Sequence, residues 1–288
     1  MYKLKDQFYT KPKVAEYCYK KFKKISQDIN VNLDNYIFIE PSAGCGCFYQ
    51  LLPKKRRIGI DIDPKKLLNV ENKGIIKSNY LIWYPKNKKK KYIVIGNPPF
   101  GYRSKQAINF FNHSAEIADI IAFIVPNQFQ KYSVHSKLVN NFNLVKEYKL
   151  KENSFYTPDK KDFNVRCVFQ IWTANNITNK NIRILTPPPI KHPDFKMYQY
   201  NNTPQALKVF NENWDFAVPR QGYENYTRRE TIKDKCEKNK QWILFKAKSN
   251  EILNRLLNID FAKISKKNTV VYGFGKADVI MEYRKIYD

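Results

Sequence analysis

The sequence is poor in acidic residues, glycine, histidine and cysteine, and its few cysteines and histidines argue against two kinds of structure. Its 288 residues include 26 Asp and Glu against 52 Lys and Arg, with 9 Gly, 3 His and 5 Cys. The odd number of scattered cysteines, without a second Cys pair or a His cluster, argues against a disulfide-rich secreted domain and a zinc site. We expect reduced thiols, no metal and an intracellular location, cytoplasmic, nuclear or in a viral factory.

Long apolar segments are also missing. The longest uncharged apolar run, Ile120 to Val125, is far too short to span a bilayer, and no apolar signal segment is visible at the N-terminus. We therefore expect no secretory signal and no membrane partner. The apolar fraction of 43% nevertheless supports a large core in one α/β domain with an appendage, or in two modest domains.

The basic excess gives a formal net charge of +26. Such a charge favours a polyanionic partner, and we predict nucleic acid. Lys, Asn, Ile and Tyr are all abundant, as an AT-rich genome would make them, so coding bias could have supplied part of the charge. The electrostatic field exists in either case.

Short apolar runs rich in β-branched residues alternate with helical patterns over most of the chain. Strands are expected at 36–39, 57–60, 74–76, 92–95, 120–125, 144–150 and 165–172. An amphipathic helix is expected at 13–28, with helical or turn segments at 65–70, 105–118 and 133–141. Alternating strands and helices form parallel sheets covered on both faces. The predicted fold class is α/β, with a doubly wound, mostly parallel, seven-stranded sheet.

A proline-rich segment, Thr186 to Pro193, ends this pattern. Residues that precede proline are kept out of the helical region, so the segment should be a stiff connector. We place one domain at residues 1–185 and a smaller α+β region at 186–288. In that region we expect a strand at 242–245, a helix at 251–257 and a strand-like segment at 269–274.

The most informative segment is Asn97-Pro98-Pro99-Phe100, which follows the apolar run 92–96. Asn followed by two prolines forms a rigid turn, in which the Asn97 amide and the free carbonyls point at one spot. The turn suits a planar substrate with an exocyclic amine: oxygens accept the N–H bonds, and the Phe100 ring stacks on its face. An ordinary loop could have the same residues. The neighbouring motifs must therefore distinguish a catalytic turn from a simple connection.

A second motif, Glu40 to Phe48, follows the first strand of the predicted sheet. Gly44 and Gly46 let the backbone turn tightly and approach a ligand closely. Asp61 lies about twenty residues on, where a carboxylate can accept both ribose hydroxyls of a nucleoside cofactor. Asp63 is the competitor, but we assign it to the cap of the next helix. Glu40 would repel a pyrophosphate and is better suited to the cationic amino-acid end of S-adenosylmethionine.

Four segments in order, at 6–12, 40–46, 59–64 and 96–100, resemble the motifs of class I amino-methyltransferases of the N6-adenine type. Their order is similar to the gamma arrangement of DNA adenine methyltransferases. The resemblance covers roughly residues 6–172. It implies the seven-stranded, Rossmann-like methyltransferase sheet, S-adenosylmethionine as cofactor, and target recognition in the C-terminal region.

The resemblance also implies a role for each matched residue. Tyr9 and Thr10 would line the methionine end of the cofactor, and Asp61 would hold its ribose. Asn79 stands where the family often has an Asp that contacts the adenine amine of the cofactor, and its amide oxygen could accept the same bond. The main cofactor loop would consist of Glu40, Pro41, Ser42, Ala43, Gly44 and Gly46.

Catalysis is assigned to the turn. The Asn97 side-chain oxygen and the Pro98 carbonyl would accept the two amine hydrogens and stabilise the positive charge that develops on the nitrogen. Phe100 would stack on the base, with Pro99 beside it. Phe163 would be a second wall of the base pocket, unless it only packs in the core. A base within a duplex would have to be flipped out to reach this turn.

These assignments predict transfer of a methyl group from S-adenosylmethionine to the N6 amine of adenine in DNA. The alternative is RNA, either structured RNA or a cap-adjacent adenosine, because the turn cannot sense the sugar. A protein glutamine is a third possible amine, but that family usually has Tyr where this chain has Phe100. In another class, the chain would be an inactive nucleic-acid-binding subunit, against which the intact motif residues argue.

The C-terminal region offers one candidate loop for substrate contact, Pro219 to Arg229. It combines cations for phosphates with aromatic rings for bases. An ordinary exposed basic loop is the alternative. The candidate substrate-binding residues are Arg220, Tyr223, Arg228 and Arg229.

Overall fold

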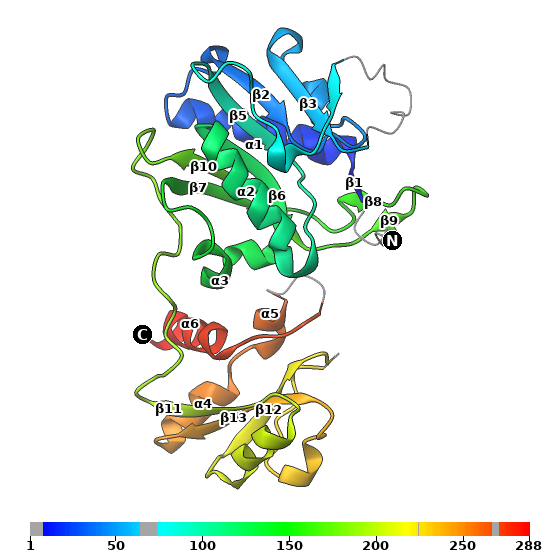
Figure 1. The fold of residues 1–288 in the computed structure, drawn as a ribbon. Coiled ribbons are helices and arrows are strands. Elements are labelled where there is room, and N and C mark those ends of the chain that lie inside the picture. The colour runs from blue at the N-terminus through cyan, green and yellow to red at the C-terminus, as the bar shows by residue number, and fades with distance from the viewer. Residues whose placement is uncertain (1–7, 64–73, 224, 267–270) are drawn as a thin grey trace. The chain divides into compact units, whose positions relative to one another are not determined.

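The structure of this protein is a computed structural model that describes residues 8–63, 74–223, 225–266 and 271–288. The chain divides into two compact units, Met1–Leu185 and Thr186–Asp288 (Figure 1), and each is described by itself. Within the described ranges, no helix has both the length and the apolar character needed to cross a membrane. The roles assigned to the two parts of the chain stay predictions.

A seven-stranded sheet forms the centre of the first unit, in the order β4-β3-β2-β5-β6-β10-β7. The pairs among β2, β3, β4, β5 and β6 are parallel, and β10 runs antiparallel to β6 and β7. The strands are β2 (Tyr36–Glu40), β3 (Arg57–Asp61), β4 (Ile75–Lys77), β5 (Lys91–Gly96), β6 (Ile120–Pro126), β7 (Phe142–Lys149) and β10 (Cys167–Ala174). The predicted α/β fold and all seven of its strands are confirmed.

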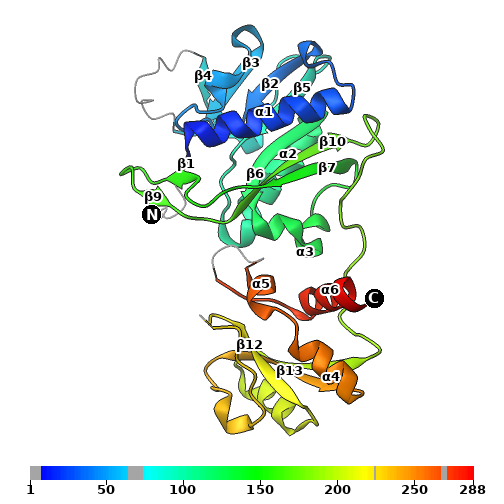
Figure 2. The same ribbon diagram turned by 180° about the vertical axis from the view of Figure 1, so that it is seen from behind.

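Helices cover both faces of this sheet. The helix α1 (Pro12–Asp28) crosses one face (Figure 2), and α2 (Lys105–Ile117) lies on the other (Figure 1), which gives three layers. Burial of Cys18, Phe22 and Ile25 along α1 follows the spacing expected of an amphipathic helix. The segment predicted at 65–70 lies outside the described residues.

The segment at 133–141, expected to be helical or a turn, contains the short helix α3 (Tyr132–His135), which ends early and is followed by turns. The buried guanidinium of Arg183 explains the early end. It donates hydrogen bonds to the backbone carbonyls of His135, Leu138, Val139 and Phe142 at 2.6–3.1 Å. Carbonyls turned toward one guanidinium cannot continue the helical ladder, so the chain turns and enters β7.

A small antiparallel sheet in the first unit was not predicted. It consists of β1 (Tyr9–Thr10), β8 (Phe155–Tyr156) and β9 (Asp162–Phe163), in the order β1-β8-β9. Strands of two residues carry no readable alternation of apolar and polar side chains. The sheet matters for function because it holds the segment that contains Tyr9 and Thr10 against a hairpin more than a hundred residues away.

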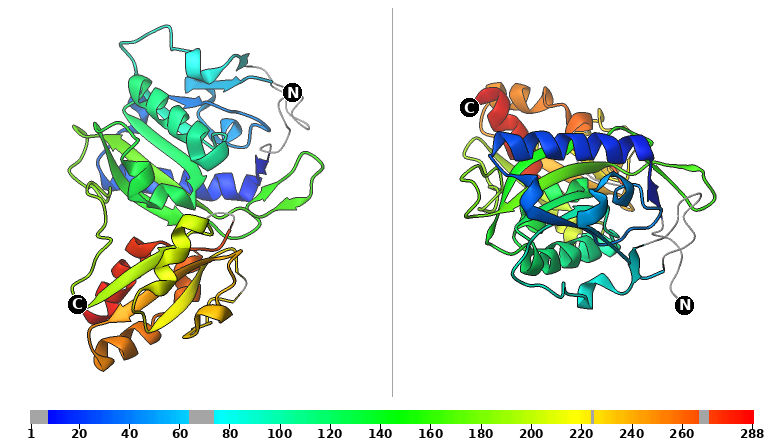
Figure 3. Two further views of the ribbon diagram at one scale, coloured as in Figure 1. Left: turned by 60° about the horizontal axis from the view of Figure 1, so that its bottom comes forward. Right: turned by 90° about the horizontal axis from the view of Figure 1, so that it is seen from above.

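The second unit is an antiparallel sheet with an apolar core on each face. Its order is β11-β13-β12, and the bounds are β11 (Phe195–Tyr200), β12 (Phe216–Gln221) and β13 (Gln241–Ala247). Ile243 and Phe245 of β13 pack in one core, whereas Trp242 and Leu244 pack in the other. Figure 3 shows this sheet with its helices α4 (Asn250–Leu257), α5 (Phe261–Ser265) and α6 (Lys276–Tyr287).

The predictions for this unit are confirmed in part. The strand expected at 242–245 lies in β13, and the helix expected at 251–257 is α4. Residues 269 and 270 of the strand-like segment lie outside the described residues. Residues 271–274 form no strand, because Gly273 makes only an isolated bridge to Gln221 and Phe274 turns into the core. The final helix, α6, was not predicted.

The Arg183 contacts predict a large loss of stability on truncation. Arg183→Ala should lower the free energy of unfolding by more than about 2 kcal/mol, because several buried carbonyls lose a charged donor. Arg183→Lys should fail to restore it, since an ammonium cannot bridge the same set of acceptors. Urea unfolding checks both variants against Lys180→Ala, an exposed control. Equal midpoints for all of them would contradict the assignment.

Candidate active site

A cavity of about 850 Å³ lies in the first unit at the carboxyl ends of β2, β3 and β5. Its lining includes the residue at or just beyond each strand end: Glu40, Asp61 and Asn97. From β2 the chain builds outward through β3 and β4, and it then places β5 on the other side of β2. Such a reversal opens a crevice at the strand ends, where α/β proteins bind their ligands.

The loop after β2 is tied to both neighbouring strands. The backbone N–H of Gly44 donates to the Asp61 carboxylate at 2.7 Å, and Ala43 N–H donates to the Ile60 carbonyl at 2.9 Å. On the other side, the Ser42 hydroxyl donates to the backbone carbonyl of Asn97 at 2.9 Å. Three motifs that lie far apart in the sequence therefore share one rigid rim.

Gly44 is required at its position for two reasons. Its φ of +52° lies in the left-handed region, and a Cβ there would lie 3.3 Å from the Tyr9 ring. Tyr9 and Thr10 both line the cavity, as the resemblance implies. The Tyr9 ring also contacts the Tyr156 ring of β8, at a centroid distance of 5.6 Å.

Glu40 is a buried carboxyl group with a free acceptor. Backbone N–H groups of Phe48 and Tyr49 donate to it, but its Oε2 has no hydrogen-bond partner among the described residues. Burial, followed by the negative charges of Cys45 and Asp61, raises the pKa of Glu40 well above its ordinary value. This carboxyl is therefore held toward its neutral form.

Asn97 presents a second free acceptor at the same cavity. Its Oδ1 is buried and has no hydrogen-bond partner in the described part of the chain. Pro98 and Pro99 line the cavity beside it. The carbonyl of Phe100 accepts the N–H groups of Gln106 and Ala107 at 3.1 and 3.3 Å, so the turn leads directly into α2.

The two aromatic rings predicted to flank a base are separated by a third ring. Phe100 is buried and does not line the cavity, and neither does Phe163. Phe8 contacts Phe100 edge-on at a centroid distance of 5.0 Å and stacks on Phe163 at 5.2 Å. Phe8 itself lines the cavity. Phe8 lies in the matched segment 6–12 beside Tyr9, but the resemblance gave it no role.

Only some of the other predicted cofactor-binding residues line the cavity. Asp61 and Asn79 line the cavity, whereas Gly46 does not. Each Asp61 oxygen accepts one backbone N–H, from Gly44 and from Asp63, and the Asn79 oxygen accepts Leu81 N–H at 3.1 Å. The segment that Asp63 was predicted to cap lies outside the described residues.

The sequence motifs did not indicate that one face of α2 lines the cavity. Lys105, Gln106, Asn109 and Phe110 also line the cavity. The signal was available, because a helix that follows a strand of a parallel sheet begins at the carboxyl edge of that sheet.

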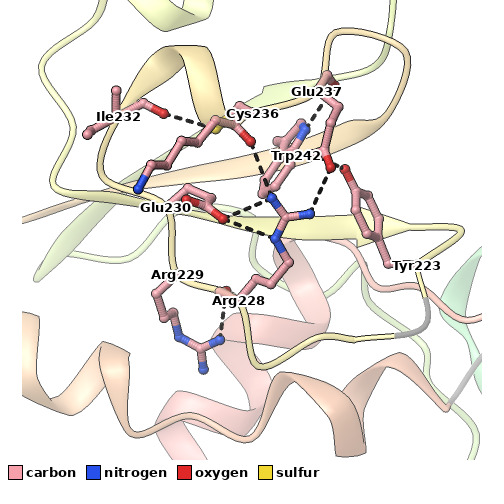
Figure 4. Close-up of polar contacts among 9 residues, drawn as sticks. Tyr223, Arg228, Arg229, Glu230, Ile232, Cys236, Glu237 and Trp242 are labelled. Atoms are coloured by element: carbon pink, nitrogen blue, oxygen red, sulfur yellow. Dashed lines mark hydrogen bonds and ion pairs between the residues drawn. The ribbon is translucent and has the colours of Figure 1, made fainter.

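In the second unit, Arg228 already has internal partners (Figure 4). Its guanidinium binds Glu230 at 2.9 Å and Glu237 at 2.8 Å, and it lies 5.2 Å from the Trp242 ring centroid. Tyr223 donates its hydroxyl hydrogen to the same Glu237 at 2.9 Å. Hydrogen bonding to Glu237 raises the pKa of Arg228 further. These contacts engage Arg228 and Tyr223 within the second unit.

Arg229 and Arg220 are occupied in the same way. Arg229 donates to the backbone carbonyls of Tyr226 and Ile259, at 3.0 Å each, and lies over the Phe261 ring. Arg220 donates to the Phe274 carbonyl at 3.2 Å. Contact of Arg220, Tyr223, Arg228 and Arg229 with a substrate stays a prediction, and the structure gives the three arginines packing roles that the sequence did not reveal.

Solved structures with a similar fold are known. No protein-family model matches the chain, and no curated protein matches it. Among solved structures, the type IIL restriction-modification enzyme MmeI, determined in complex with DNA, has a TM-score of 0.50 at 10% identity, covering 92% of this chain and 65% of that one. PH1948 from Pyrococcus horikoshii, a proposed RNA methyltransferase, has a TM-score of 0.43 at 18% identity, covering 59% and 88%. The strand order of the first unit and the match to MmeI give it a Rossmann-like methyltransferase fold.

The Arg228 contacts predict that its loss destabilises the second unit. Arg228→Ala should lower the free energy of unfolding by about 1–2 kcal/mol, because Glu230 and Glu237 lose their charged donor. Thermal melting and amide exchange in β13 measure the loss. Lys235→Ala removes the same charge from an exposed side chain and is the control. Weaker nucleic-acid binding by Arg228→Ala at unchanged stability would instead make Arg228 a substrate contact.

Proposed function

We propose that this protein transfers a methyl group from S-adenosylmethionine to the N6 amine of adenine in DNA. The observation that carries the proposal is the buried, unpaired Oδ1 of Asn97, a residue that lines the same cavity as the Glu40–Asp61 rim. A buried acceptor without a donor is costly, and an amine hydrogen would satisfy it. The turn therefore fits an amino group as the methyl acceptor.

The residues of the rim fit the cofactor. Glu40 offers an unpaired Oε2 that could accept a hydrogen bond from a cationic amino group. Asp61 could accept ribose hydroxyls, because a carboxylate oxygen that accepts one N–H retains further acceptor capacity. A volume of about 850 Å³ lies in the range of small-molecule sites. When bound, the cofactor supplies a methyl group activated by a sulfonium.

The chain's own contribution is to orient and polarise the acceptor. The Asn97 oxygen and the Pro98 carbonyl would hold the two amine hydrogens, so that the nitrogen lone pair leaves the plane of the ring. Both acceptors would stabilise the positive charge that grows on this nitrogen. The bond from Ser42 to the Asn97 carbonyl restrains the turn at a set distance from the cofactor loop.

DNA is the substrate that we favour. The net charge of +26 suits a polyanion. MmeI, whose structure contains DNA, is similar to both units of this chain, since the match covers 92% of it. An adenine in a duplex must leave the stack to reach the Asn97 turn. Phe8 would then have to yield space between Phe100 and Phe163, so we assign Phe8 to the base pocket.

The proposal is tested by methyl transfer from labelled S-adenosylmethionine to duplex DNA, single-stranded DNA and RNA, with nucleoside analysis of the product. We expect N6-methyladenine in DNA. Asn97→Ala should lower kcat at least about 100-fold, since it removes one of two acceptors at the developing charge. Binding of the cofactor should survive in this variant.

Asn176→Ala, an exposed amide in the same unit, is the matched control and should keep wild-type turnover. If N6-methyladenine formed only in RNA, the substrate would be RNA instead of DNA, and the proposed methyl transfer would stand. If Asn97→Ala kept near wild-type turnover, the catalytic role proposed for Asn97 would be wrong. Absence of cofactor binding by calorimetry would instead favour an inactive nucleic-acid-binding protein.

The raised pKa of Glu40 predicts that cofactor binding releases a proton. A cationic ligand favours the carboxylate, so affinity should increase with pH above the ordinary value of 4.5 and level off beyond the raised pKa of the free protein. Calorimetry in two buffers of different ionisation enthalpy measures the protons released. Glu40→Gln should bind more weakly and lose this dependence. If the dependence persists in Glu40→Gln, another group such as Cys45 is responsible.

A further inference from the structure

Two of the five cysteines stand apart from the others. Cys18, Cys167 and Cys236 are buried in apolar cores, with exposed fractions of 0%, 1% and 2%. Cys45 and Cys47 are half-buried in the cofactor loop, and both line the cavity. Neither has a part in the proposed methyl transfer, so their chemistry needs a separate account.

The two sulfur atoms are in direct contact. Cys45 Sγ lies 2.9 Å from Cys47 Sγ, and Cys47 Sγ lies 3.2 Å from the backbone carbonyl of Thr10. Gly46 stands between the two cysteines with a φ of +75°, a conformation that turns both side chains to the same side. The loop therefore already holds the pair near bonding range.

The electrostatics of the loop favour a thiolate at Cys45. Hydrogen bonding from Cys47 is the largest effect, and hydrogen bonds from Tyr156 and from backbone N–H groups add to it, so that the pKa of Cys45 falls to about 6. The same bond raises the pKa of Cys47, which stays a thiol. At pH 7 an ordinary cysteine is only a few per cent thiolate, and the lowered pKa shifts Cys45 toward the thiolate.

We propose that Cys45 and Cys47 are a peroxide-oxidisable thiol pair, which closes to a disulfide within the cofactor loop. The Cys45 thiolate attacks one oxygen of hydrogen peroxide, the O–O bond breaks, and the departing hydroxide takes a proton to become water. The sulfenic acid formed on Cys45 is then attacked by Cys47. An S–S bond forms, the S–O bond breaks, and the thiol proton and hydroxide leave as a second water. Two sulfurs are oxidised and the peroxide oxygens are reduced.

Closure would change the cavity wall. The sulfurs must approach from 2.9 Å to a bond of about 2.05 Å, which pulls on a loop whose N–H and hydroxyl groups bind Asp61 and Asn97. The negative charge of Cys45 beside Glu40 also disappears. Resting on the proposed function, we expect oxidation to weaken cofactor binding at least tenfold, and a dithiol reductant to restore it.

The test treats the full-length reduced protein with stoichiometric hydrogen peroxide and maps the peptides by mass spectrometry. We expect the peptide that contains both cysteines to lose two hydrogen atoms, while Cys18, Cys167 and Cys236 stay reduced. In Cys47→Ser, oxidation should stop at a sulfenic acid on Cys45 that dimedone traps. In Cys45→Ser, Cys47 should resist peroxide. Cys236→Ser is the matched control and should form the disulfide as the wild type does.

Equal oxidation of all five cysteines, or a reduced Cys45 after treatment, would overturn the proposal. This readout needs no cofactor, so it can succeed or fail independently of the proposed function. Cofactor titration of the reduced protein tests that function. A disulfide that forms without changing the measured affinity would overturn only the link to the cofactor.

Discussion

The place of β2 between β3 and β5 is the constraint on which the site depends. Because strands are added first on one side of β2 and then on the other, the ends of three parallel strands meet at one edge. The loop after β2 can reach both neighbours, through Gly44 to Asp61 and through Ser42 to Asn97. A shift of this loop would move the cofactor rim and the Asn97 turn together.

Two unpaired acceptors in the cavity-lining residues bear more directly on the proposed function than the sequence motifs do. Glu40 Oε2 and Asn97 Oδ1 are buried without hydrogen-bond partners among the described residues. Proteins rarely leave such atoms unsatisfied, since the loss of water is not repaid. One acceptor fits a cationic amine and the other a neutral one, and this difference supports a methyl donor and a methyl acceptor in one cavity.

Charge composition was a weaker guide than contacts. The excess of basic residues correctly describes the field of the chain, but it cannot identify which cations are available to a ligand. Arg228 is bound by Glu230 and Glu237, and Arg229 is bound by backbone carbonyls. Both acidic partners lie within ten residues of Arg228 in the sequence. The order of residues alone, however, does not show whether nearby opposite charges form an ion pair.

The seven strands, α1 and the three motifs of the rim could be read from local patterns in the chain. Buried parallel strands read as short apolar runs, and the glycines and prolines of the motifs act on their own backbone. Three features could be seen only in the folded protein: the β1-β8-β9 sheet, the early end of α3 at Arg183, and the place of Phe8 between Phe100 and Phe163. Each of these depends on contacts between residues distant in the chain, which leave no local period to read.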